Sequence, residues 1–122
     1  MNIIIADDSS MIRERIKRFL SFVPNANVVG EAQDGQEAEQ LIAHHQPDLL
    51  VLDISMPKRN GIDVLRSVKS RYPRIKVIVL SNFVDRSSIK LARAAGADFV
   101  FDKSSEFELL VKFVTLYGDL VD

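Results

Sequence analysis

Residues 49–52 are four consecutive apolar residues, and the run ends in a carboxylate, Asp53. An uninterrupted apolar run of this length is typical of a strand that is buried on both faces of a parallel sheet. Pro57 and Gly61 follow and predict a loop before the next helical pattern. Asp is common in turns, so Asp53 alone decides nothing. Ligands of open parallel α/β sheets, however, bind at the carboxyl ends of the strands, which is where Asp53 would lie.

Four other strand-like segments recur along the chain, separated by segments in which apolar residues have helical spacing. The predicted strands cover residues 3–6, 28–32, 49–53, 77–80 and 99–101. Gly30 interrupts the second strand, which we therefore expect near an edge of the sheet. The predicted ends of helices are marked by Pro24, Pro47, Pro73 and Gly96. This alternation predicts βα units on a parallel sheet, with right-handed crossovers and helices on both faces.

Two predicted helices begin with a capping box, in which an N-cap side chain is followed three residues later by Glu. Asp34 and Glu37 form one such pair, and Ser105 and Glu108 form the other. The serines at 9–10 are N-cap candidates for the first helix.

Composition narrows the class of protein. The chain has 122 residues, enough for one domain with a sizeable core, which we expect to cover residues 1–122. Apolar residues make up 47% and charged residues 27%, with a net charge of −1, which indicates neither a nucleic-acid nor a membrane surface. Cysteine is absent, which excludes disulfides and thiol chemistry. No stretch approaches the ~20 apolar residues of a membrane span, and no signal-peptide pattern opens the sequence, so we expect a cytoplasmic location.

Polar residues stand at the carboxyl ends of most predicted strands. They are Asp7 and Asp8 after the first, Asp53 in the third, Ser81 after the fourth and Lys103 after the fifth. If the first and third strands are neighbours, three carboxylates converge, and their repulsion calls for a counter-charge such as Mg²⁺. A carboxylate beside Mg²⁺, a hydroxyl and an ammonium suit phosphoryl transfer, with Asp53 as nucleophile. Each residue also has an ordinary explanation as a cap, a turn residue or a solvated lysine, but together they fit one reaction.

With these residues identified, the sequence resembles the receiver domain of two-component response regulators over essentially its whole length. The resemblance is carried by Asp7-Asp8, Asp53 with Met56-Pro57 and Gly61, Ser81, Ala95-Gly96-Ala97-Asp98 and Lys103. It implies a flavodoxin-like (βα)5 fold, a doubly wound α/β architecture whose parallel five-stranded sheet has the order 2-1-3-4-5.

The resemblance also implies a role for each site residue. Asp53 corresponds to the phosphoacceptor, which takes a phosphoryl group from the phosphohistidine of a sensor histidine kinase or a phosphotransfer protein. Ser81 corresponds to the hydroxyl that contacts the phosphoryl group, and Lys103 to the salt-bridge lysine. Such a receiver is a signalling switch that catalyses its own phosphorylation and dephosphorylation. The implied Mg²⁺ ligands are Asp8 directly, Asp7 often through water, Asp53, and the backbone carbonyl of Ser55.

The resemblance departs from the family pattern near the end of the chain. Val100 stands where the family usually carries an aromatic residue, Thr or His. Because side chains alternate along a strand, we expect Phe99 and Phe101 on the opposite face, so the aromatic mode of switching is not predicted.

The last helix is predicted to be apolar on two faces. One stripe suits the core and consists of Phe107, Leu110, Val111 and Val114. The second stripe consists of Leu109, Phe113 and Leu116. It indicates a surface for an output protein or a second copy of the chain, although shielding by the 119–122 tail explains it equally well. A kinase is expected beside the first helix, near Met11, Ile12 and Glu14.

The alternatives are one variant of the receiver interpretation and two functions of other classes, both of which rank well below it. The chain can be the receiver fragment of a longer DNA-binding response regulator. A flavodoxin-like cofactor module would need a phosphate loop after the first strand, where Asp7-Asp8 would repel phosphate. A Mg²⁺-dependent phosphohydrolase of small molecules would need a second Asp two residues after its nucleophile, where Ser55 stands.

Overall fold

The computed structural model describes residues 1–54, 60–81, 86–103 and 105–121. Its five parallel strands form one sheet in the order β2-β1-β3-β4-β5, which confirms the predicted α/β fold. The elements are β1 (Asn2–Ala6), α1 (Ser10–Leu20), β2 (Asn27–Ala32), α2 (Gly35–His45), β3 (Leu49–Asp53), α3 (Gly61–Arg71), β4 (Lys76–Ser81), α4 (Arg86–Ala94), β5 (Phe99–Asp102) and α5 (Phe107–Val121).

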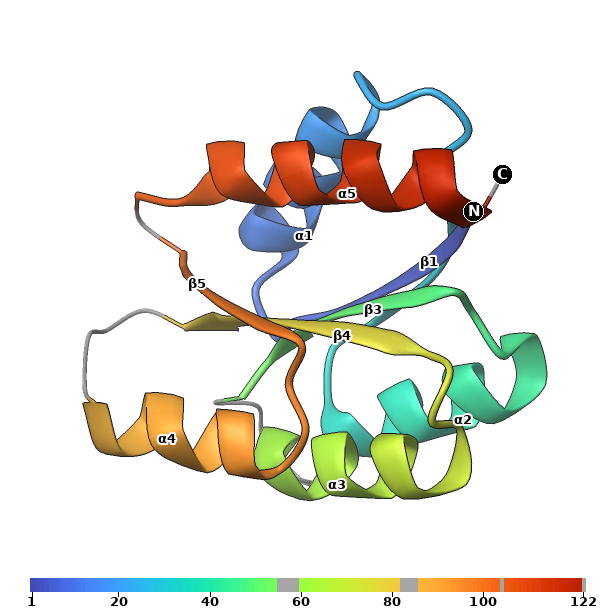
Figure 1. Cartoon of the computed structure of the whole chain (residues 1–122). Helices are drawn as coiled ribbons and strands as arrows, with labels where there is room; N and C mark the ends of the chain where they lie inside the picture. Colours follow the sequence, from blue (N-terminus) through green and yellow to red (C-terminus); the bar gives the residue numbers. More distant parts are fainter. Residues whose placement is uncertain (55–59, 82–85, 104, 122) are drawn as a thin grey trace.

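The helices cover the sheet on both faces, with α1 and α5 on one side and α2, α3 and α4 on the other (Figure 1). Successive residues of a strand point to opposite faces. In β1, Ile4 packs in the core on the α2–α4 side, whereas Ile3 and Ile5 pack on the α1 and α5 side. Each such fully buried side chain stabilises the fold by about 1.5–3 kcal/mol. The central strands are uninterruptedly apolar because both of their faces are buried.

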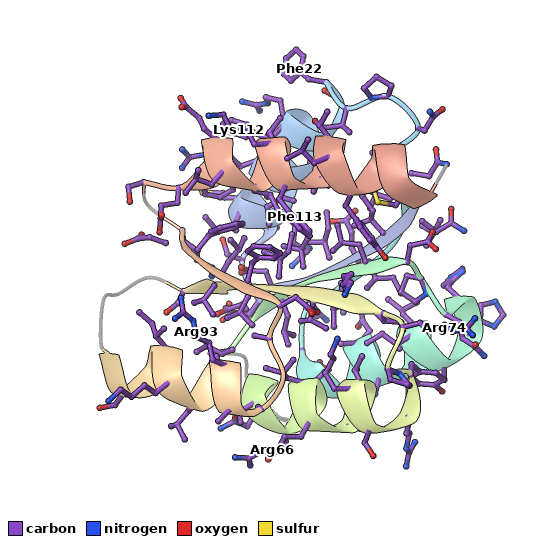
Figure 2. The ribbon with its side chains drawn as sticks, in the orientation of Figure 1. Phe22, Arg66, Arg74, Arg93, Lys112 and Phe113 are labelled. Atoms are coloured by element: carbon purple, nitrogen blue, oxygen red, sulfur yellow. The ribbon has the colours of Figure 1, made fainter. Side chains whose placement is uncertain are left out.

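The predicted arrangement of β2 and β5 is also confirmed. The strand with Gly30 lies at an edge of the sheet. In β5, Val100 packs on the α2–α4 side and Phe101 on the α1 and α5 side. Phe99 contacts the ring of Phe113 in α5 at 4.2 Å between centroids. Phe113 points from α5 toward the sheet, whereas Phe22 projects away from the molecule (Figure 2).

Helix boundaries differ from the expected ones at two places. Ser9 caps α1 as predicted, but the helix ends at Leu20 and Val23 is buried through a turn. Asp34 Oδ1 accepts the Glu37 N–H as the first capping box predicts. The second capping box is wrong. The sequence predicts Ser105 as the N-cap, but α5 begins at Phe107, so the N-cap position is one residue later, at residue 106.

Candidate functional site

The carboxyl ends of the strands bring the predicted site residues together. Asp53 ends β3 and Ser81 ends β4, one strand away. Asp7 follows β1 directly, and its N–H donates to the Ala32 carbonyl of β2 at 3.0 Å. Lys103 follows β5, and its N–H donates to the carbonyl of Ser81 at 2.8 Å. Backbone pairing between neighbouring strands therefore places all four residues at the carboxyl-terminal end of the sheet.

The ammonium of Lys103 joins two buried carboxylates. Its Nζ lies 2.6 Å from Asp7 Oδ2 and 3.1 Å from Asp53 Oδ2. The exposed fractions of Asp7, Asp53 and Lys103 are 1%, 4% and 5%. Charges are rarely buried so deeply unless they are paired. The predicted salt bridge of Lys103 is therefore present in the structure.

Burial shifts the pKa values at this site. It raises the pKa of Asp7, although the hydrogen bond from Lys103 and the Ser9 N–H act in the opposite direction. Burial by itself would lower the pKa of Lys103. The hydrogen bond with Asp7 and the charge of Asp53 outweigh it, so the pKa of Lys103 is raised.

Three carboxylates at the carboxyl-terminal end of the sheet have the chemistry of a divalent-cation site. Asp7, Asp8 and Asp53 each offer one ligand oxygen, and these oxygens lie within 4.8 Å of one another. Asp8 is exposed, whereas the other two are buried. Mg²⁺ prefers oxygen ligands and commonly binds through one or two carboxylates and several waters, so this donor set fits it. Ser55, the fourth predicted ligand, lies outside the described residues, as do Met56 and Pro57.

Ser81 carries a buried hydroxyl that has no hydrogen-bond partner among the described residues. Its residue is 3% exposed. Leaving a buried hydroxyl unsatisfied costs roughly 1–3 kcal/mol. An unsatisfied buried group calls for an explanation, and a ligand bound at this cluster of charges would supply one.

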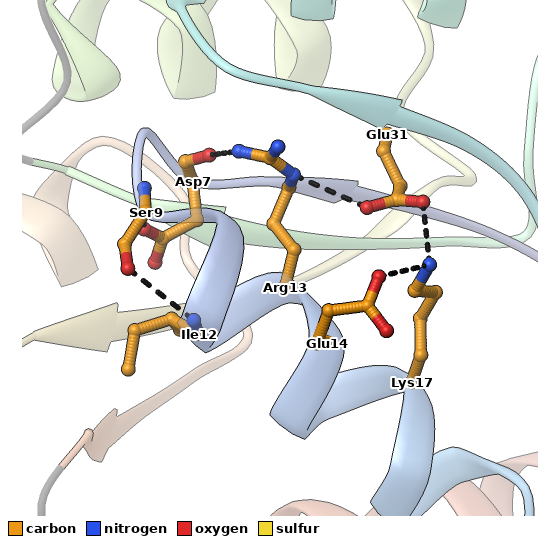
Figure 3. Close-up of polar contacts among 7 residues, drawn as sticks. All are labelled: Asp7, Ser9, Ile12, Arg13, Glu14, Lys17 and Glu31. Carbon is orange, nitrogen blue, oxygen red and sulfur yellow. Dashed lines mark hydrogen bonds and ion pairs between the residues drawn. The ribbon is translucent and has the colours of Figure 1, made fainter.

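Arg13 and Glu31, which the sequence alone did not single out, hold the loop after β1 (Figure 3). Arg13 donates to the backbone carbonyl of Asp7 at 2.7 Å and to Glu31 Oε1 at 3.1 Å. Lys17 donates to the other Glu31 oxygen at 2.9 Å. Arg13 and Lys17 are four residues apart and lie on one helix face, which is the only feature of the sequence that could have indicated this contact. Their acidic partner on β2 follows only from the order of the strands.

Exposed apolar side chains also lie on helices that cover the sheet. On α5, Leu116 is 66% and Leu109 is 40% exposed, while the ring of Phe113 stacks on Tyr117 and contacts Phe99 in a tilted arrangement. The predicted second stripe is therefore partly exposed and partly packed. On α1, Met11 is 81% exposed. None of the described helices is long and apolar enough to cross a membrane.

The fold and the cluster at the carboxyl-terminal end of the sheet define a class of protein. Residues 3–115 match the response regulator receiver domain, and the chain belongs to that family.

Particular relatives are similar over most of the chain. The transcriptional regulatory protein DegU of Brevibacillus brevis is 36% identical over 114 residues, which cover 93% of this chain and 48% of DegU. A protein-glutamate methylesterase/protein-glutamine glutaminase of Pyrococcus horikoshii is 33% identical over 115 residues, which cover 92% of this chain and 31% of that protein. The solved signal receiver domain of the response regulator NarL from Mycobacterium tuberculosis is 35% identical with a TM-score of 0.84, covering 93% of this chain and 91% of that one. The chain thus spans about half or less of the length of these two curated relatives.

Proposed function

We propose that residues 1–122 form one receiver domain that accepts a phosphoryl group on Asp53. The donor is the phosphohistidine of a sensor histidine kinase or of a phosphotransfer protein. The observation that carries the proposal is the buried Lys103 between Asp7 and Asp53, with the hydroxyl of Ser81, which has no partner among the described residues, on the adjacent strand. Family membership supports it independently.

The proposed step is a displacement at phosphorus. A carboxylate oxygen of Asp53 forms a P–O bond as the P–N bond to the imidazole breaks. The imidazole nitrogen keeps the electron pair and takes a proton from solvent water. The Lys103 ammonium and the Ser81 hydroxyl then bind phosphoryl oxygens, which gives the hydroxyl its missing partner.

A divalent cation completes the charge balance of this site. Asp7, Asp8, Asp53 and the backbone carbonyl of Ser55 would hold Mg²⁺. When bound, the metal neutralises carboxylate charge and stabilises the negative phosphoryl oxygens. With that help the domain promotes its own phosphorylation and, with water as nucleophile, its own dephosphorylation.

The partners follow from the same proposal. The kinase or phosphotransfer protein docks beside α1, where a hollow of about 640 Å³ is lined by Met11, Glu14 and Phe19 among others. The exposed part of α5 contacts an output protein or a second copy of the chain. The match covers only 48% of DegU. In the alternative that this chain is part of a longer regulator, an output domain on the same polypeptide would be the partner that α5 contacts. Sedimentation with and without phosphodonor tests the second copy, and a monomer in both conditions would exclude it.

Two further parts of the proposal concern location and the alternative chemistry. We place the chain in the cytoplasm, which cell fractionation tests. A phosphohydrolase of small molecules is disfavoured, because its second Asp is replaced by Ser55 in the sequence.

The deciding experiment is incubation with a small phosphodonor, with and without Mg²⁺, followed by intact mass measurement. We expect a single phosphoryl adduct that requires Mg²⁺ and disappears in Asp53→Asn. Asp63→Asn is a matched control, because Asp63 is an exposed carboxylate of α3. An adduct that survives in Asp53→Asn, or no adduct in the wild type, would overturn the proposal.

A further inference from the structure

Arg13 connects the edge strand β2 to the loop after β1, which carries Asp7 and Asp8 (Figure 3). One end of its guanidinium donates to Glu31 Oε1 at 3.1 Å, and the other donates to the backbone carbonyl of Asp7 at 2.7 Å. The side chain is 16% exposed, so it is largely enclosed. Arg13 therefore bridges two segments with a rigid, planar group.

The carbonyl that Arg13 contacts belongs to the peptide group between Asp7 and Asp8. A peptide group is planar, so a hydrogen bond to its oxygen restricts the rotation of the whole group. The Asp7 side of this link is already held, because its N–H donates to Ala32 and its Oδ1 accepts the Ser9 N–H at 2.9 Å. The hydrogen bond from Arg13 therefore restrains the peptide group that leads into Asp8.

Lys17 provides an internal comparison. It lies one turn after Arg13 and shares Glu31, with Nζ 2.9 Å from Oε2, and it also pairs with Glu14 at 2.7 Å. Both of these partners are side-chain carboxylates near the surface. Arg13 and Lys17 carry the same charge and share an anchor, but Arg13 also contacts the acidic loop.

We propose that Arg13 is a positioning residue, which sets the spacing of the carboxylates of Asp7, Asp8 and Asp53 for a divalent cation. This inference rests on the proposed function, since it concerns the metal site of that function. It makes a prediction whose sign is informative. Removing a nearby positive charge should by itself strengthen cation binding, because it removes repulsion. Loss of positioning should weaken cation binding.

The test is a calorimetric titration of Mg²⁺ into the metal-free full chain. We expect the dissociation constant to rise about tenfold in Arg13→Ala, as for other groups that orient metal ligands. In the matched control Lys17→Ala it should change by less than about twofold, since a surface charge has a weak effect. Binding by Arg13→Ala that equals or exceeds the wild type would overturn the proposal.

A second variant and a metal-free measurement separate positioning from folding and from function. Arg13→Lys keeps the charge but cannot span both acceptors with one planar group, so we expect it to bind Mg²⁺ nearly as weakly as Arg13→Ala. Without metal, the backbone ¹⁵N signals of Asp8 should shift or broaden in both Arg13 variants and stay unchanged in Lys17→Ala. Unchanged Asp8 signals would contradict positioning. A wild type that binds no Mg²⁺ would overturn both the metal site of the proposed function and the positioning role, whereas Mg²⁺ binding that is unchanged in Arg13→Ala would overturn the positioning role alone.

Discussion

The two ends of the sheet each carry a lysine–aspartate cluster, and the two clusters are built differently. At the amino end, Asp98 Oδ2 accepts from Lys69 Nζ at 2.9 Å and from the Val77 N–H at 2.8 Å. Lys69 also donates to the carbonyl of Ile75 at 2.9 Å. This cluster joins α3, β4 and the segment before β5 through matched donors and acceptors. We therefore interpret it as a cluster that stabilises the fold.

The cluster at the carboxyl end is not balanced in this way. Lys103 is shared by Asp7 and Asp53, and the exposed carboxylate of Asp8 lies beside them. The hydroxyl of Ser81 has no hydrogen-bond partner in the described part of the chain. Similar residue types therefore complete their bonds at one end of the sheet, whereas at the other end acid is in excess and, among the described residues, a polar atom is left without a partner, which fits the proposed binding role.

The largest difference between the clusters should appear when each lysine is removed. Without metal, Lys103→Met should lower the free energy of unfolding by about 3 kcal/mol, because two buried carboxylates lose their cation. Mg²⁺ should restore part of that loss, since it binds the folded state. Urea denaturation with and without Mg²⁺ measures both effects. Lys69→Met is the control, and its stability should not respond to Mg²⁺ beyond the response of the wild type. A similar Mg²⁺ response in both variants would remove the distinction.

Asp98→Ala should be the next largest effect. It leaves the Val77 N–H and the Lys69 ammonium without their acceptor, which costs about 2 kcal/mol in unfolding free energy. The folded fraction should still form the phosphoryl adduct, because Asp98 lies at the opposite end of the sheet. Thermal unfolding and intact mass measure the two properties separately. Loss of the adduct in fully folded protein would show that the amino-end cluster is more than structural.

Gly96→Ala sharpens the structural side of the comparison further. Gly96 has φ +110°, and an added Cβ would lie 2.9 Å from Lys69 Cγ. Lys69 is tied to Asp98 and Ile75, so moving it away strains the cluster. We expect a loss of about 1–2 kcal/mol in stability from the backbone conformation and this contact. Denaturation of Gly118→Ala, where the added Cβ would approach Met1 at 3.4 Å, is the control. Equal losses would argue against a special role for Gly96.

The smallest expected effect concerns the pH dependence of stability. Burial, the largest cause, raises the pKa of Asp7 above its unfolded value, so the folded chain binds this proton more tightly. The stability contribution is then present below the unfolded pKa and is lost as pH rises through the folded pKa. Asp7→Asn should therefore be more stable than the wild type at neutral pH without metal, and the difference should shrink on acidification. Urea denaturation between about pH 4 and pH 7 measures it, and a difference that grows on acidification would contradict the argument.

Much of the fold and site was predictable from local sequence. The apolar runs identified the three central strands, because strands buried on both faces need uninterrupted apolar residues. The edge strands β2 and β5 were identified from shorter or interrupted runs. The polar residues at the strand ends marked the site through their positions in the sequence alone. Helix ends were less predictable: Val23 continues the apolar pattern of α1 but is buried through a turn, and the start of α5 was misplaced. Apolar spacing reports burial, and both a helix and a turn can bury the same residue.

The sequence by itself determined the alternation of strands and helices and the identity of Asp7, Asp53, Ser81 and Lys103 as polar strand ends, because both depend on residues close together in the chain. The tertiary structure decided which of these side chains touch and how they are held. Glu31 and Arg13 belong to different elements, and they meet because β2 pairs beside β1. Such contacts depend on strand order and register, which are properties of the whole chain rather than of any one segment.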